Sequence, residues 1–217
     1  MIPFAAWPRR AAILMVALGL ALAPASGRTA EAVTAEDAGA FISKLGSKAI
    51  AKLGDETVPY DDRVQTFREM VQEYFAMEAI SRFVLGRYWR IATPEKQEAF
   101  REAFLGVITQ RFLPLFEGFE QDDFNMESAK PDPNNPDRLF LVSSRISQPD
   151  GTGTVKAGWR VQKREEGLQI VDVLAEGVSM AITLRSEYNS VIQRNGGQVS
   201  ALIDRLETNL AKGAYKP

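Results

Sequence analysis

The sequence predicts an α+β fold in which helices lie on one face of a four-stranded antiparallel meander. Two observations predict it. Apolar residues recur every three or four positions before residue 117 and after residue 177, which is helical spacing, whereas apolar and polar residues alternate between residues 124 and 174, as in strands. Turn-rich stretches separate the predicted strands, and such short connections join antiparallel neighbours.

The helix predictions depend on amphipathic spacing and on capping signals. Thr34 and Asp37 have the spacing of a capping box. Thr93-Pro94-Glu95 combines a capping residue, a proline suited to the first turn and an acid that complements the helix dipole. The predicted helices span residues 34–54, 60–75, 77–83, 94 to a kink or end at 114, 178–194 and 198–210.

The strand predictions depend on alternation and on turn residues. Residues 131–137 and 148–153 are rich in Pro, Asn, Asp and Gly, and Gly167 closes a tight hairpin. The predicted strands are a segment from Phe124 to Ser128, followed by residues 138–147, 154–163 and 168–174.

Five large apolar residues follow the long predicted helix at four-residue spacing: Phe100, Phe104, Ile108, Phe112 and Phe116. Aromatic residues at helical spacing are typical of a packed core. Large side chains that face a curved sheet can also line a cavity. The spacing alone does not separate core from cavity, so both interpretations stay open.

The composition excludes several kinds of chemistry. The chain has neither cysteine nor histidine, which excludes disulfides, Ser-His and Cys-His catalysis, and zinc sites built from thiolate or imidazole. The sequence also lacks a Gly-rich phosphate loop. Its formal net charge of −2 disfavours nucleic acid as a partner. We therefore expect no cofactor, no metal and no enzymatic activity.

Asp172 interrupts an apolar strand segment, residues 170–174. It is a buried acid with catalytic potential, or a strand residue that lies on the solvated face or pairs with a neighbouring arginine or tryptophan N–H. The solvated face or the pairing is the simpler explanation.

The first 25 residues have the pattern of a cleaved export signal. Arg9 and Arg10 form a basic start, residues 11–23 are uncharged and rich in Ala and Leu, and a small-x-small cleavage pattern ends at Ala25. The apolar run is shorter than the roughly 20 residues that cross a bilayer as a helix. The sequence therefore predicts a signal peptide followed by one domain over residues 26–217.

Three segments together resemble one protein family. They are residues 85–100 (LGRYWRIATPEKQEAF), residues 171–179 (VDVLAEGVS) and residues 185–203, which contain RSEY, NGG and LI. The family is MlaC, the periplasmic phospholipid-binding component of the Mla lipid-transport system, also called the toluene-tolerance auxiliary family. It includes members associated with hopanoid synthesis.

The resemblance implies an apolar cavity, enclosed between the sheet and the helices, that holds lipid acyl chains. It also implies a periplasmic shuttle that carries a phospholipid or a hopanoid-type lipid between an inner-membrane ABC transporter complex and an outer-membrane lipoprotein complex. On this basis we expect twelve lipid-binding residues: Phe67, Phe75, Phe83, Trp89, Phe100, Phe104, Ile108, Phe112, Val142, Ala157, Trp159 and Val171.

Two other functions compete with the shuttle. One is a hydrolase or isomerase on a similar α+β scaffold, with Asp172 acting beside Arg or Tyr partners. The other is a structural or chaperone-like partner protein whose cavity is filled by its own side chains.

Overall fold

The computed structural model describes residues 33–148, 153–165 and 167–216. The predicted signal peptide, residues 1–25, and the first residues of the predicted domain lie outside the described part. Within that part, no helix combines the length and the apolar character that crossing a membrane requires.

The helices follow the predicted order closely. Thr34 and Asp37 form the predicted capping box, with the Thr34 amide donating to Asp37 Oδ2 over 2.8 Å. Thr93 caps the long helix by accepting the Lys96 amide. The helices are α1 (Ala35–Leu53), α2 (Tyr60–Tyr74), α3 (Met77–Leu85), α4 (Pro94–Phe112), α5 (Met180–Arg194) and α6 (Val199–Ala211), with 3₁₀ turns η1 (Gly86–Arg90), η2 (Leu113–Phe116) and η3 (Gln121–Asp123).

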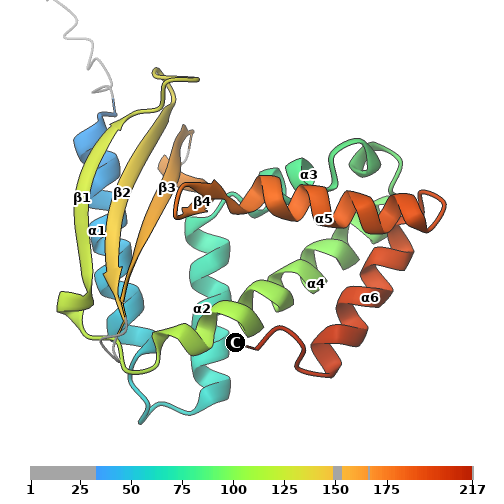
Figure 1. The fold of residues 1–217 in the computed structure, drawn as a ribbon, viewed down its shortest axis with the longest axis horizontal. Coiled ribbons are helices and arrows are strands. Elements are labelled where there is room, and N and C mark those ends of the chain that lie inside the picture. Colours follow the sequence, from blue (N-terminus) through green and yellow to red (C-terminus); the bar gives the residue numbers. More distant parts are fainter. Residues whose placement is uncertain (1–32, 149–152, 166, 217) are drawn as a thin grey trace, which may run out of the picture. The chain divides into compact units, whose positions relative to one another are not determined.

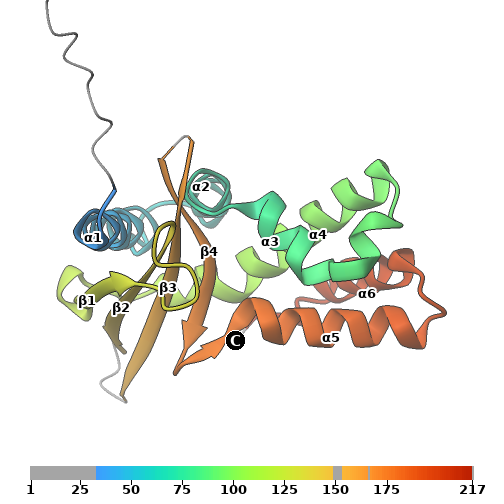
Figure 2. The same cartoon turned by 90° about the horizontal axis from the view of Figure 1, so that it is seen from above.

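The sheet is an antiparallel meander, and α1 and α2 lie on one of its faces (Figures 1 and 2). Its strands are β1 (Phe124–Pro131), β2 (Leu139–Ser147), β3 (Thr154–Arg164), β4 (Gly167–Ala175) and β5 (Val178–Ser179). Val142, Trp159 and Val173 are register partners on the face that α1 and α2 cover. Because side chains alternate along a strand, Leu141, Arg160 and Asp172 lie on the opposite face.

The sheet has one strand more than the predicted four. Ala175 pairs with Val178 across a two-residue turn in which Glu176 and Gly177 have φ of 49° and 82°. Positive φ at both central residues is characteristic of the tight turns that close hairpins. Val178 and Ser179 therefore pair as a strand, and α5 begins at Met180 rather than at the predicted Val178.

The buried apolar residues form two clusters, a division that we did not predict from the sequence. The helical core combines α3, η1, α5, α6 and part of α4, with Val84, Leu85, Phe100, Phe104, Ile192 and Leu202 among its buried members. The sheet core combines α1, α2, η2, the sheet and the rest of α4, with Ile42, Leu53, Leu113, Phe140, Val142 and Ile170 among its buried members.

Helix α4 joins the two cores because its apolar stripe turns around the helix axis. A step of four residues in an α-helix with 3.6 residues per turn advances by about 40°. Phe100 and Phe104 face the helical core, Ile108 packs against both cores, and Phe112 faces the sheet core. Over these three steps the stripe turns by about 120°, so one helix is buried on two sides.

Candidate functional site

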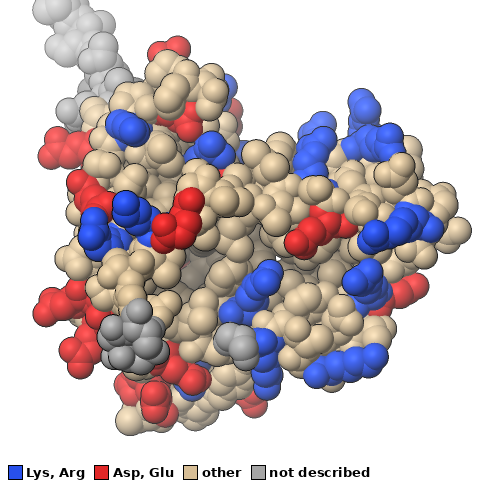
Figure 3. Space-filling model, in the orientation of Figure 1, with Lys and Arg blue, Asp and Glu red and all other residues tan. Residues whose placement is uncertain are grey.

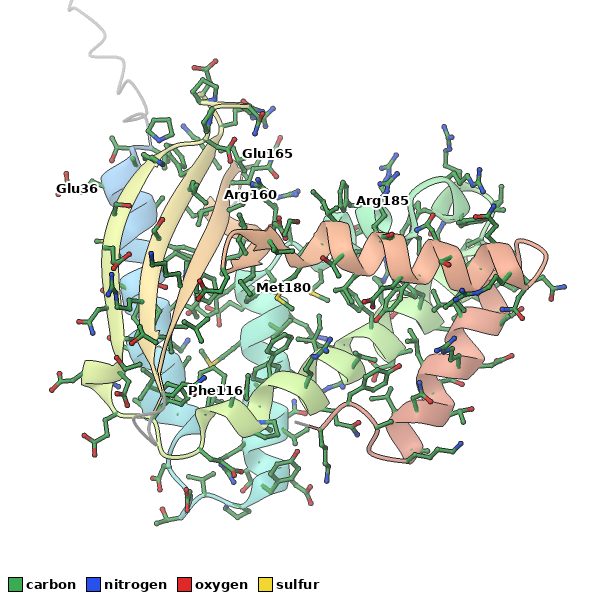
Figure 4. The ribbon with its side chains drawn as sticks, viewed as in Figure 1. Glu36, Phe116, Arg160, Glu165, Met180 and Arg185 are labelled. Carbon is green, nitrogen blue, oxygen red and sulfur yellow. The ribbon has the colours of Figure 1, made fainter. Side chains whose placement is uncertain are left out.

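The surface is hollowed where β4, α4 and the start of α5 come together (Figure 3). Met180, the first residue of α5, points from that helix toward α4 at this place (Figure 4). The hollow therefore lies between elements of the sheet core and elements of the helical core.

Both the sheet and α4 carry half-buried apolar side chains that pack against the sheet core. Trp159 and Val173 come from the inner face of the sheet, and Phe112 comes from the last turn of α4. The Trp159 ring meets Phe124 edge-on with 6.5 Å between ring centres, and its Nε1 donates to Ser144 Oγ over 2.9 Å. Because this hydrogen bond satisfies the polar atom of the indole, the rest of the ring is available for apolar contact.

A second hollow of about 280 Å³ lies where α2 meets α3, beside the end of the β3–β4 hairpin. Phe75 and Met77, which line it, pack against both cores. Arg164 also lines it, and among the described residues its buried Nε has no hydrogen-bond partner. Pockets for drug-sized ligands hold about 300–1,000 Å³, so this hollow is small by comparison.

The structure distributes the twelve predicted lipid-binding residues over the two cores rather than around one space. Phe83 lies apart from the others, exposed on α3 under the guanidinium of Arg185. The helical core contains Trp89, Phe100 and Phe104, and the sheet core contains Phe67, Phe112, Val142 and Trp159. Two further residues, Phe75 and Ile108, pack against both cores. On the strands, Ala157 is buried and Val171 is half-buried.

Phe100 and Phe104 are close-packed. Their rings stack with 5.5 Å between centres, and each meets the Tyr188 ring edge-on. Phe104 is only 1% exposed. Burial raises the pKa of Tyr188 above its ordinary value, with Tyr215 and Glu187 adding to the rise. This part of the stripe forms packed interior.

Of the alternatives considered for Asp172, the structure shows the pairing with an arginine. Its carboxylate is 8% exposed and accepts three hydrogen bonds: from Arg160 Nη1 over 2.7 Å, from Ser179 Oγ over 2.6 Å and from the Ala181 amide over 3.0 Å. The last two partners lie at the start of α5. Asp172 therefore fixes α5 to the sheet.

Arg160 extends this network to the β1–β2 connection. Its Nε donates to Asp132 Oδ2 over 3.3 Å, and Asp132 also accepts the Asn134 amide. Burial alone would raise the pKa of Asp132, but the hydrogen bonds from Asn134 and Arg160 outweigh it and hold the pKa below its ordinary value. Arg160, labelled in Figure 4, thus connects two buried acids, Asp132 in the β1–β2 connection and Asp172 on β4.

Three side chains named above were not among the predicted residues: Phe124, which packs on α1 at Gly46, Val173 and Met180. The alternation of apolar and polar residues along the strands could have identified Val173, because it lies directly opposite Trp159 in the neighbouring strand. No sequence pattern identifies Met180, because its position depends on the turn at Glu176, which determines where α5 begins. Within the described ranges, no group of three or more acidic side chains could hold a metal ion.

Comparison with known proteins gives three findings. The profile of the family described as MlaC protein matches residues 44–208. The intermembrane phospholipid transport system binding protein MlaC of Haemophilus influenzae is 23% identical over 146 residues, which cover 66% of this chain and 64% of that protein. The chain therefore spans somewhat less than two thirds of the length of that curated relative.

The third finding concerns the fold. A phospholipid-binding protein from Ralstonia solanacearum, solved in complex with a phospholipid, superimposes with a TM-score of 0.67 at 20% identity. The match covers 82% of this chain and 98% of the other. The two chains share one fold.

Proposed function

This chain belongs to the MlaC protein family, and we propose from that premise that it is a lipid-binding carrier that moves a phospholipid or a hopanoid-type lipid across the periplasm. One observation of the structure supports the proposal most directly. Helix α4 and the sheet border a hollow between two separately packed cores, and both elements carry half-buried apolar side chains that pack against the sheet core. A lipid needs such a place, where apolar surface is available without dismantling a core.

The energetics explain why a carrier is needed. Transfer of a methylene group into water costs about 0.8 kcal/mol, so two chains of roughly 15 methylenes carry a cost on the order of 24 kcal/mol. Spontaneous passage through an aqueous compartment is correspondingly slow. A protein that offers a similar apolar environment lowers this barrier, and it releases the lipid as long as it does not bind it too tightly.

We place the acyl chains at the boundary of the two cores. Ile108 and Phe112 of α4 would contact them from one side, and Trp159 and Val173 from the other. The hollow of about 280 Å³ beside Phe75 is too small for a two-chain lipid. We therefore place the lipid at the boundary of the two cores and not in this hollow.

The relatives extend the proposal to location and partners. The curated relative is named for an intermembrane phospholipid transport system, and the structural neighbour holds a phospholipid. By analogy, this chain would be exported by its predicted leader and would receive and deliver lipid at an inner-membrane ABC transporter complex and an outer-membrane lipoprotein complex. The hydrolase or isomerase alternative gains no support from Asp172, whose carboxylate is bound to three structural partners.

A transfer assay tests the proposal. Donor vesicles that contain a fluorescent phospholipid are mixed with unlabelled acceptor vesicles, with and without the mature protein. We expect catalytic amounts of protein to speed the appearance of intact fluorescent lipid in the acceptors. A rate equal to the protein-free rate contradicts the carrier, and release of free fatty acid would favour the hydrolase.

A further inference from the structure

Charge is unevenly distributed between the two parts of the protein. Residues 77–112 and 180–217, which build the helical core, contain eleven Lys and Arg against seven Asp and Glu. Residues 33–76 and 113–179, which build the sheet core, contain twelve Lys and Arg against twenty Asp and Glu. In the space-filling view, Lys and Arg gather over α3, α5 and α6, whereas Asp and Glu dominate over the sheet (Figure 3).

The excess of positive charge is concentrated on α3, η1 and α5. These elements carry five arginines against two glutamates, Glu78 and Glu187. Arg82, Arg87, Arg90 and Arg185 are all exposed, and none of them forms an ion pair within the part of the chain that the structure describes.

Gly86 brings these arginines together. It ends α3 with φ of 56°, and a Cβ there would come within 2.9 Å of Arg185 Nη2, so the guanidinium lies directly over this glycine. Arg82 is one helical turn before Gly86, and Arg87 follows it. Aromatic contacts hold two of the guanidinium groups in place, since Arg185 packs over the Phe83 ring and Arg87 over the Tyr88 ring, each at 4.9 Å.

Large apolar side chains are exposed beside the arginines. Phe83 is 43% exposed under Arg185, Ile182 is 57% exposed one turn before Arg185 on α5, and Ile91 is 69% exposed directly after Arg90. We call this surface the arginine face: Arg82, Phe83, Arg87, Arg90, Ile91, Ile182 and Arg185. Arg185 donates a hydrogen bond to the Phe83 carbonyl and Arg87 donates one to the Tyr88 hydroxyl, but neither interaction neutralises the charge. Guanidinium groups with no ion-pair partner in the described ranges, beside exposed aromatic and aliphatic side chains, suit an anionic membrane surface, where the charges meet phosphates and the apolar groups enter the headgroup boundary.

We propose that the arginine face docks this protein onto bilayers that contain anionic phospholipid. The inference rests on the proposed carrier function, because a carrier has to meet a membrane or a membrane-bound partner. The acidic sheet side would be repelled by the same surface, so docking would also orient the molecule. A bilayer is favoured over an acidic protein because the apolar residues protrude singly among the arginines, and none of them lines the hollow between α2 and α3.

Vesicle co-sedimentation of the mature protein tests the docking surface. Vesicles of pure phosphatidylcholine are compared with vesicles that contain 30% phosphatidylglycerol (about one lipid in three, enough for several anionic contacts per protein). We expect binding to the anionic vesicles only, and loss of binding near 1 M salt, where the Debye length is about 3 Å.

The double variant Arg82→Gln/Arg90→Gln tests whether vesicle binding occurs through the arginine face. Neither side chain makes a hydrogen bond or an ion pair among the described residues, so the fold should be retained. Each arginine near an anionic surface contributes about a fivefold change in partitioning, so we expect about a 30-fold loss. The matched control Lys44→Gln/Lys156→Gln removes two exposed charges from the sheet side and should leave binding unchanged.

The outcomes separate the docking surface from the carrier function. Wild-type partitioning by the Arg82→Gln/Arg90→Gln variant, or equal binding to both kinds of vesicle, overturns the docking proposal even if the protein carries lipid. Loss of lipid transfer while the variant still binds anionic vesicles fully would give the arginine face a role other than membrane docking, which also overturns the proposal. Arginine-dependent vesicle binding by a protein that transfers no lipid would leave docking in place and remove the carrier.

Discussion

Ser179 donates its hydroxyl to Asp172 Oδ2 over 2.6 Å, and the same hydroxyl oxygen accepts the amide of Ile182. One serine therefore connects the C-terminal part of β4 to the first turn of α5. The Ala181 amide adds a second bond to the other carboxylate oxygen. Through these contacts Asp172, on the sheet, sets where the helical core begins.

Replacement of Asp172 by Asn should lower the free energy of unfolding by about 1.5–3 kcal/mol, because the hydrogen bonds from Arg160 and Ser179 lose their charged acceptor. Urea unfolding followed by circular dichroism measures this. The control is Asp204→Asn, an exposed acid on α6, where we expect a change within about 0.5 kcal/mol. Equal free energies of unfolding for the two variants would show that the hydrogen bonds of Asp172 do not stabilise the fold.

Phe104→Ala and Phe112→Ala should differ in cost. Phe104 is enclosed by Phe100 and Tyr188, so truncation leaves a cavity and should cost about 3–5 kcal/mol. Phe112 is only half-buried and lies at the proposed lipid position, so truncation removes less buried apolar surface and we expect a cost of less than about 2 kcal/mol. Denaturant unfolding of both variants gives the comparison. A loss at Phe112 as large as that at Phe104 would identify the whole stripe as ordinary core.

The Phe stripe also shows how far the sequence supports prediction. Its four-residue spacing correctly predicted a long helix, and Thr93-Pro94 correctly predicted its start. The spacing did not reveal that the stripe serves two cores, since the 40° advance per step matters only when partners lie on both sides of the helix. Those partners, such as Tyr188 for Phe104 and Phe67 for Phe116, come from distant parts of the chain.

The strands and the site show a similar limit. Alternation and turn residues predicted β2, β3 and β4 to within one residue at each end, whereas β1 extends three residues beyond its predicted end at Ser128. The fifth strand was missed because Glu176 takes a positive φ, a conformation that this residue type rarely favours. The pairing of Asp172 with an arginine was anticipated, but its bonds to Ser179 and Ala181 depend on that unpredicted turn.

Filling the boundary hollow should reduce lipid content. Val173→Trp adds bulk on the inner face opposite Trp159, where the side chain is half-buried. We expect less bound lipid per protein with a cooperative unfolding transition retained. The control is Leu174→Trp, which points to the opposite face beside Gly158. Lipid content that falls equally in both variants would place the lipid elsewhere.

Asp132 should make the protein sensitive to acid. Its folded pKa lies below the unfolded value of about 3.9, so its contribution to stability is fully present above that pH and is lost as the pH falls below it. Asp132→Asn should flatten the fall of unfolding free energy between about pH 4 and pH 2.5. Asp137→Asn, in the same connection but exposed, should keep the wild-type slope. Parallel slopes for both variants would remove Asp132 from the acid response.

Native mass spectrometry of the protein, purified from a bacterial periplasm without detergent, tests the carrier most directly. We expect a population of protein that is heavier than the polypeptide by the mass of one lipid. Dissociation of that complex should release an intact two-chain phospholipid or a hopanoid-type lipid. The heavier population should shrink in Val173→Trp and persist in Leu174→Trp. A single species at the polypeptide mass, in protein that is folded and has been incubated with phospholipid vesicles, would contradict the account.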